Sequence, residues 1–225
     1  TARQMLDYGK LPGGKYMLNW PKQGNDFYAN VVEATPKERQ AAYAMAKLQT
    51  LRFLYFIQTE LGFRNLGLAQ GVYPTPDELP FIPYHREGRR LQGLVRMTVN
   101  NILTPFQAEN PVGRTGIAVG DYPIDHHHTK NPAAPKIDFP AVPSFSVPLG
   151  VLIPASMDNL LVADKAVSVT NIVNGSTRLQ PVVIQLGQAA GALAALAIAK
   201  NIQPRAVPVR EVQEVLLAAG VQIMP

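Results

Sequence analysis

The chain has 225 residues, enough for one hydrophobic core and a second smaller unit at about 100–200 residues per domain. Hydrophobic residues make up 47% and charged residues 16%, a composition that excludes a wholly disordered chain. The chain has no cysteine, which excludes disulfides, thiolate metal sites and a cysteine nucleophile, and its net charge of +5 at pH 7 mildly favours an anionic partner.

The first predicted regular element is a long helix that begins after Thr35. The first 35 residues carry turn-forming clusters of Pro, Gly and Asn, which predict loops. Thr35, Pro36 and Glu38 supply an N-cap hydroxyl, a proline at the first helical position and a capping-box partner. Gly62 would end the helix. Its expected core-facing stripe repeats at intervals of three and four residues: Ala44, Leu48, Leu51, Leu54, Ile57 and Leu61.

The middle of the chain predicts strands between proline-rich loops. Residues 71–83 hold four prolines, which forbid a long helix and indicate an ordered loop that leads into a strand. The β-branched alternation of 97–102 predicts a strand, and residues 117–125 predict another. The prolines of 132–148 indicate a connection with short extended pieces.

The C-terminal part combines a short apolar run with two helices. Residues 159–163 predict a buried strand, and a polar loop that contains Ser176, Thr177 and Arg178 follows. An Ala-rich helix spans 181–199, and an amphipathic helix that stops at Gly220 closes the chain. Together the elements predict an α+β fold, a mixed β-sheet with helices packed on it.

The Ala-rich segment permits a second interpretation as a membrane span. It is uncharged over about 20 residues, the length that a bilayer needs, and Gly187 and Gly191 have GxxxG spacing. However, its apolar residues are largely alanine and two glutamines interrupt them, which favours a helix buried all round in a globular protein. We therefore expect a soluble protein, with its compartment, cytoplasm or periplasm, left open. Because the chain opens at Thr1 without an initiator Met and has no signal-peptide pattern, we expect a processed product or a fragment.

Residues 159–200 carry a resemblance to a known family. After the predicted strand and the Arg-bearing loop, the helix has the sequence Gly187-Gln188-Ala189-Ala190-Gly191. This order is similar to the C-terminal signature of FAD-dependent oxidoreductases of the fumarate reductase and glutathione reductase superfamily. Further segments along nearly the whole chain resemble the bacterial branch of FAD-dependent oxidoreductases: 19–21, 24–26, 58–62, 83–90 and 121–128.

The resemblance implies a flavin bound at the junction of the C-terminal strand and the long helix. It implies a substrate-domain-like region over residues 1–150, and over 151–225 the strand and helices of an interrupted FAD-binding domain. The sequence lacks the family's GxGxxG phosphate turn and the acidic ribose ligand beyond it. The chain would then be a C-terminal portion, inactive by itself, whose partners are a missing N-terminal FAD-binding segment and a small-molecule substrate.

By matching position, the resemblance implies cofactor contacts on both sides of the Arg-bearing loop. Lys165 stands where relatives have an acidic or basic ribityl contact, and Asp164 stands where many have glycine. Gln180, Pro181 and Val182 would place the helix start beside the pyrimidine edge of the flavin. The free N–H groups and the dipole of a helix start favour such an electron-rich group.

Three side chains are candidates for catalysis. Arg178 matches an arginine that faces a substrate carboxylate in the fumarate reductase branch, with a loop arginine that caps carbonyls as the alternative. His126 and His128 could donate or accept a proton above a flavin, because imidazole exchanges protons near neutral pH. On a strand the two imidazoles would share a face, so a metal site or simple space filling are the alternatives.

A basic segment at 84–96 supplies candidates for substrate binding. Arg86, Arg89 and Arg90 could clamp a carboxylate or phosphate, because guanidinium groups pair bidentately with planar anions. A scaffold in which Glu87 and other acids form salt bridges with them is the alternative. Nucleic-acid binding would need a longer basic stripe with exposed aromatic side chains, and we expect none.

These patterns predict the C-terminal part of a flavin-dependent oxidoreductase that acts on an anionic or polyhydroxylated small molecule. The alternative is a carbohydrate-acid lyase or sugar-binding module without flavin. In that alternative an arginine neutralises the carboxylate and a His or Tyr abstracts the proton. It leaves the C-terminal segment unexplained.

Overall fold

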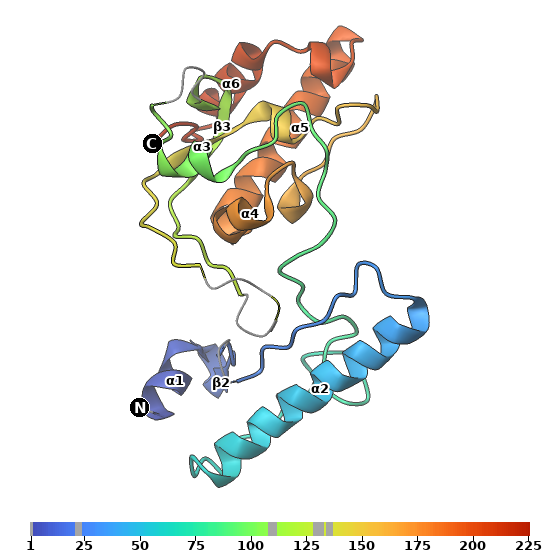
Figure 1. The fold of residues 1–225 in the computed structure, drawn as a ribbon, viewed down its shortest axis with the longest axis vertical. Helices are drawn as coiled ribbons and strands as arrows, with labels where there is room; N and C mark the ends of the chain where they lie inside the picture. Colours follow the sequence, from blue (N-terminus) through green and yellow to red (C-terminus); the bar gives the residue numbers. More distant parts are fainter. Residues whose placement is uncertain (1, 21–23, 108–111, 128–132, 134–136) are drawn as a thin grey trace. The chain divides into compact units, whose positions relative to one another are not determined.

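The computed structural model describes residues 2–20, 24–107, 112–127, 133 and 137–225, which form two compact units (Figure 1). The first unit comprises Thr1–His85 with His127–Lys136, and the second comprises Arg86–His126 with Ile137–Pro225. The segment that begins at Arg86 thus packs with the C-terminal elements in the second unit. The functional assignment of the regions 1–150 and 151–225 stays a prediction.

The start of the first unit is more regular than the sequence predicts. Helix α1 (Ala2–Tyr8) precedes an antiparallel pair of two-residue strands, β1 (Lys10–Leu11) and β2 (Lys15–Tyr16). A turn at Pro12–Gly14 joins the strands, and Gly13 adopts there a φ of 74°, a left-handed conformation that favours glycine. The prediction of loops over the first 35 residues is wrong for this hairpin because the turn residues join strands.

Helix α2 (Pro36–Thr59) confirms the predicted capping at both ends. The Glu38 side chain accepts hydrogen bonds from the N–H and the hydroxyl of Thr35, at 2.8 and 2.7 Å, and the Glu38 N–H donates to the Thr35 hydroxyl at 3.4 Å. Gly62 follows with a left-handed φ of 79°. The helix boundaries thus follow directly from local sequence.

The predicted core stripe of α2 is wrong over most of its length. Of its six residues only Ile57 is fully buried, whereas Ala44, Leu48 and Leu51 are exposed. Phe53, outside the stripe, is the second buried side chain of the helix. Periodicity predicts an apolar face, but burial also needs elements to cover that face, and a unit this small has few to offer.

We expect the first turn of α2 to weaken in acid. The hydrogen bonds from Thr35 lower the pKa of the Glu38 carboxyl below its ordinary value. A lowered folded-state pKa contributes stability that is present above the unfolded-state pKa and is lost as the pH falls through the folded-state pKa. A pH titration of α2 amide chemical shifts by NMR should show this fraying, and Glu38→Gln should keep the capping box but flatten the pH dependence. Identical titrations of the two proteins would contradict this assignment.

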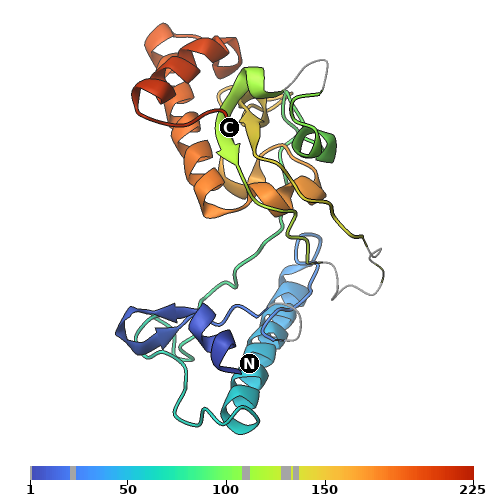
Figure 2. The same cartoon turned by 90° about the vertical axis from the view of Figure 1, so that its left-hand side faces the viewer.

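The second unit is built around an antiparallel strand pair with helices on it (Figure 2). Strands β3 (Gly116–Gly120) and β4 (Phe145–Pro148) pair with each other, and helices α5 (Gln180–Lys200) and α6 (Val209–Ala218) pack against β3. Helix α3 (Val99–Leu103) contacts β4 and helix α4 (Asn171–Thr177). All these elements contribute to one core, which includes Met97, Ile102, Ile117, Phe145, Leu152, Leu186, Leu193 and Leu216.

Two predicted strands of the second unit are absent from the described structure. Residues 99–103 form α3 because Thr98, before the helix, donates its N–H to the Asn101 side chain at 2.7 Å. Residues 159–163 form no strand, and Leu160 is 41% exposed. Asp164–Ala166, which follows, is a single turn of 3-10 helix.

The fold is α+β, as predicted, but the expected mixed sheet is wrong. Over the ranges that the structure describes, both sheets are two-stranded and antiparallel. Parallel pairing is confined there to one isolated bridge between Met97 and Val169. The predicted polar loop around Ser176 is also different, since most of it lies in helix α4.

Helix α5 is confirmed in place but is not buried all round. Its buried residues lie on one face and are spaced three to four apart: Val182, Leu186, Ala189, Leu193 and Ala197. Ile184 and Ile198, by contrast, are 68% and 81% exposed. By length and composition alone α5 could cross a membrane. One apolar face of α5, with five buried residues, packs in the core of the second unit.

A side-chain amide fixes the register between α5 and β3. Gln185 accepts a hydrogen bond from the Val119 N–H at 3.0 Å and donates to the Val119 carbonyl at 3.4 Å. The same amide donates to the Pro181 carbonyl in the first turn of α5 at 3.1 Å. The start of α5 is therefore tied to the strand pair rather than held by its own backbone alone.

Candidate functional site

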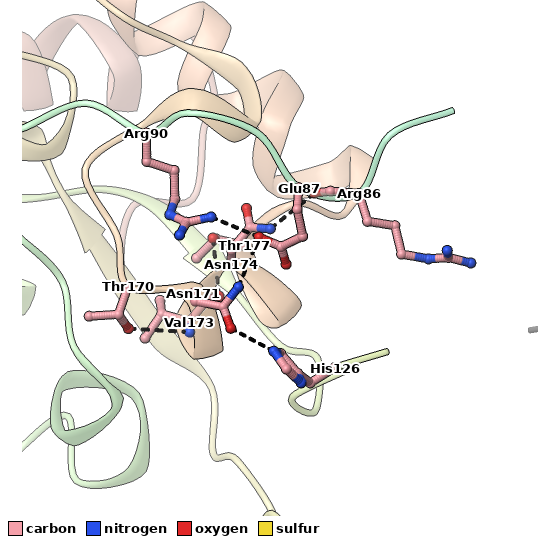
Figure 3. Close-up of polar contacts among 9 residues, drawn as sticks. All are labelled: Arg86, Glu87, Arg90, His126, Thr170, Asn171, Val173, Asn174 and Thr177. Carbon is pink, nitrogen blue, oxygen red and sulfur yellow. Dashed lines mark hydrogen bonds and ion pairs between the residues drawn. The ribbon is translucent and has the colours of Figure 1, made fainter. Parts of the chain in front are cut away.

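Helix α4 is the element around which most of the predicted catalytic and substrate-binding residues gather. It begins after Thr170, whose hydroxyl accepts a hydrogen bond from the Val173 N–H at 3.5 Å, and five of its seven residues are buried. The segments that carry Arg86 and His126 both contact it through hydrogen bonds (Figure 3). All of these residues belong to the second unit.

Arg178, which ends α4, is buried against Asp125. Its side chain is 6% exposed, and its Nη2 donates to the Asp125 carboxylate at 2.6 Å and to the Asp125 carbonyl at 3.2 Å. The Arg178 N–H also donates to the Asn174 carbonyl at 3.0 Å, so the residue caps the helix through its backbone. Asp125 thus holds the guanidinium through both its carboxylate and its carbonyl.

Three buried polar atoms of this region have no hydrogen-bond partner in the described structure: Asn174 Oδ1, Ser176 Oγ and Arg178 Nε. A buried polar atom left without a partner costs about 1–3 kcal/mol. Asn174 uses its other amide atom, Nδ2, to donate to the Arg86 carbonyl at 3.1 Å, which fixes its orientation because a carbonyl only accepts. The region therefore has unused hydrogen-bonding capacity, including one cationic donor.

The start of α5 lies two residues beyond Arg178 and has no side-chain cap. Its N-cap is Leu179, and Pro181 in the first turn has no N–H. The first hydrogen bond of the helix joins the Val183 N–H to the Leu179 carbonyl at 3.0 Å. The N–H groups of Gln180 and Val182 are left outside the helical ladder, so they are able to face an electron-rich group.

His126 ends a row of hydrogen bonds that begins at Arg90. Arg90 Nη1 donates to Glu87 Oε2 at 2.7 Å, and Asn171 Nδ2 donates to the same oxygen at 3.1 Å. Asn171 Oδ1 lies 2.6 Å from His126 Nε2. The imidazole also packs edge-on against Phe139, with the ring centroids 5.9 Å apart. The second predicted catalytic histidine, His128, lies outside the described residues.

The three arginines predicted to bind substrate have different surroundings. Arg90 pairs with Glu87, which is the contact that the scaffold alternative requires. Arg86 holds α4 through its backbone carbonyl, and its side chain points away from the α4 contacts in Figure 3. Arg89 is exposed. Whether any of them binds substrate stays a prediction.

The residues predicted to contact a cofactor lie at α5 and at the short turn Asp164–Ala166, which contacts α5. Asp164 has a left-handed φ of 63°, which explains why glycine suits this position and why a short polar residue tolerates it. Gln180 and Pro181 are exposed, whereas the Val182 side chain is buried in the core. At Val182 only the backbone can therefore meet a ligand.

Sequence reasoning named Glu87 as a salt-bridge partner but missed three other residues that order the site. Asp125 pairs with Arg178, and Asn171 and Asn174 each hold a segment that crosses α4. The three-residue spacing of Asn171 and Asn174 could have identified them as partners on one face of a helix, because residues three apart share a helix face. It went unused because residues 171–177 were expected to form a loop.

Within the described residues, neither a cluster of metal ligands nor either of two cavities coincides with the predicted site. Within the described ranges, no group of three or more His, Asp or Glu side chains could hold a metal ion. A cavity of about 560 Å³ lies at the C-terminal end of α5, next to Ile198 and Ile202, and one of about 360 Å³ lies beside Trp20 and Phe53 in the first unit. Neither is lined by a predicted site residue.

Comparisons with known proteins give one match. Searches of curated proteins and of solved structures found nothing similar to this chain. The model of one protein family, described as FAD dependent oxidoreductase, matches residues 1–216. Since this match covers almost the entire sequence, the chain belongs to the family of FAD-dependent oxidoreductases.

Proposed function

We propose that this chain supplies the C-terminal, flavin-facing part of an FAD-dependent oxidoreductase that acts on an anionic or polyhydroxylated small molecule. Family membership supports flavin-dependent oxidoreductase chemistry. The observation that carries the finer proposal is Arg178, a buried cation held by Asp125 whose Nε has no partner in the described structure. A fixed donor of this kind suits a carboxylate or another anionic oxygen of a substrate.

The residues at the start of α5 fit the edge of a flavin ring by their donor chemistry. The uncapped first turn offers backbone N–H groups at Gln180 and Val182, and the helix dipole favours negative charge at that end. The Asp164–Ala166 turn contacts the same helix, so Asp164 and Lys165 would approach the ribityl chain. When bound, FAD would supply the acceptor for a hydride from a substrate carbon.

The adenine and pyrophosphate half of FAD needs a different site. The sequence contains no GxGxxG turn, so we propose that a segment outside residues 1–225 binds that half. In this proposal the chain is a C-terminal portion and has no turnover alone. Its own residues orient substrate and handle the proton.

The side chains around α4 divide these tasks. Arg178 orients the substrate anion, and Asp125 keeps the guanidinium in place. His126 accepts the proton that a substrate hydroxyl releases, a role that His128 would share. Arg86, Arg89 and Arg90 would attract the anionic substrate toward the site, with Arg90 doing so in its ion pair with Glu87.

The test is the protein translated from the full reading frame, purified and screened with hydroxy acids and sugar acids for loss of the visible flavin bands without oxygen. We expect bound FAD and its reduction by an anionic substrate. Arg178→Ala should slow that reduction at least ~100-fold, the scale of losing one fixed donor in an active site, while circular dichroism stays unchanged. Arg210→Ala is the matched control, because Arg210 is 88% exposed and pairs with Glu214 in its own helix.

Two results would overturn the proposal. One is a full-length protein that binds no flavin, and the other is an Arg178→Ala variant that reduces flavin at the wild-type rate. Formation of an unsaturated sugar acid by the present chain without any cofactor would instead establish the lyase alternative.

A further inference from the structure

The row of hydrogen bonds from Arg90 to His126 has a direction that chemistry imposes. Arg90 pairs with the Glu87 carboxylate, and an ionised carboxylate has acceptor atoms only. Asn171, 3.1 Å from Glu87 Oε2, must therefore turn its Nδ2 donor toward Glu87. The two ends of an amide group have nearly the same shape, so the hydrogen bond to Glu87 is what fixes which end of the Asn171 side chain faces it (Figure 3).

The amide then dictates which nitrogen of His126 carries the proton. With Nδ2 toward Glu87, the Asn171 oxygen faces His126 Nε2 at 2.6 Å, and this oxygen only accepts. His126 Nε2 must therefore donate, so the neutral imidazole is in the Nε2–H tautomer. In that tautomer the lone pair lies on Nδ1.

We propose that Glu87 and Asn171 are positioning residues that hold His126 in the Nε2–H tautomer, through the hydrogen bond that His126 Nε2 donates to the Asn171 amide oxygen. This inference rests on the proposed function for the role of His126.

The surroundings of the row keep its members in register. Asn171 is the first residue of α4, which Asn174 fastens to the Arg86 carbonyl, one residue before Glu87. Glu87 and Asn171 thus sit on two segments that are already joined. The ring of Phe139 contacts the imidazole edge-on and restricts its rotation. The Asn171 amide thus links the charged carboxylate of Glu87 to the imidazole of His126.

The test is NMR of the present chain with ¹⁵N-labelled histidine, at a pH well above the range where free imidazole is protonated. The chain has four histidines, and the resonances missing from His126→Gln identify His126. In the wild type we expect its Nδ1 at the shift of a nitrogen without a proton and its Nε2 at that of an N–H.

Glu87→Gln is the decisive variant. A glutamine offers both a donor and an acceptor, so Asn171 can turn over and present either atom to His126. The Nδ1 shift of His126 should then move toward that of a protonated nitrogen, and Asn171→Ala should move it as well. Glu214→Gln, an exposed carboxylate paired with Arg210 on α6, is the matched control and should leave the spectrum unchanged. Glu87→Asp, which keeps an acceptor-only group, should restore most of the wild-type shift.

A wild-type His126 in the Nδ1–H form or in a mixture of tautomers overturns the inference, and so does a Glu87→Gln spectrum identical to that of the wild type. Turnover of the full-length enzyme separates this failure from that of the proposed function. If His126→Gln keeps full turnover while the tautomer is fixed as expected, the proton role of His126 is overturned and the positioning by Glu87 stands.

Discussion

Replacing Asp125 by alanine is expected to destabilise the second unit by about 3 kcal/mol. The variant leaves the Arg178 guanidinium, 6% exposed, without its counter-charge, and breaking a buried ion pair by removing one partner costs about 3–5 kcal/mol. The lower end applies because the Asp125 side chain is 39% exposed, so water weakens the pair. Hydrogen exchange of the α4 and α5 amides at increasing urea concentration measures the loss.

A second substitution shows whether the buried charge is the cause. In the Asp125→Ala background, Arg178→Met removes the uncompensated buried cation while filling much of the same volume. We therefore expect the double variant Asp125→Ala, Arg178→Met to be more stable than Asp125→Ala alone. If adding Arg178→Met brings no recovery, the loss comes from packing around Asp125 and the ion-pair explanation fails.

Replacing Gly175 by alanine is expected to disturb the whole site through the backbone. A Cβ at Gly175 would lie 2.9 Å from the Asp125 carbonyl oxygen and 3.1 Å from its nitrogen, closer than side-chain carbons normally approach. The Asp125–His126 segment must then move away from α4, which loosens both the Arg178 ion pair and the His126 hydrogen bond. Overpacking of this kind costs about 1–3 kcal/mol.

Gly187→Ala is the control for this prediction because a Cβ there meets no atom within 4 Å. In an open position of a helix interior, alanine should stabilise by up to about 1 kcal/mol relative to glycine. The two substitutions make the same chemical change in helices and should shift the urea midpoint of the second unit in opposite directions. Equal shifts would mean that helix propensity, and not contact with Asp125, decides the effect at Gly175.

The helices of this fold were predictable wherever local signals at their ends agreed with the pattern inside. Thr35 and Glu38 begin α2, Pro181 lies in the first turn of α5, and Gly220 follows α6 with a left-handed φ of 76°. These signals depend on backbone hydrogen bonds within a few residues, so no tertiary information is needed. The same logic identifies α3, where the Thr98 and Asn101 pair was overlooked in favour of the β-branched alternation.

Burial was less predictable because it depends on what the rest of the chain provides. The apolar run at 159–163 predicted a buried strand, yet no neighbouring strand covers Leu160 in the described structure. The apolar stripe of α2 likewise has too few elements against it. A sequence pattern states which face can be buried, and only the packing of distant segments decides whether it is.

The candidate site was likewise predictable in its residue types but not in its long-range contacts. Residue type and family resemblance suggested Arg178 and His126, and the structure brings both to α4. Their partners Asp125 and Asn171 could not be inferred, because 53 and 45 residues separate the members of these two pairs. Contacts over such separations depend on the fold rather than on spacing along the sequence.

The two asparagines of α4 also fasten the chain where it passes between its units. Arg86 is the first residue of the second unit and His126 the last before the chain leaves it, and Asn174 and Asn171 bind them respectively. The segment from Arg86 to His126 therefore begins and ends on the same helix, so α4 closes this part of the second unit into a loop.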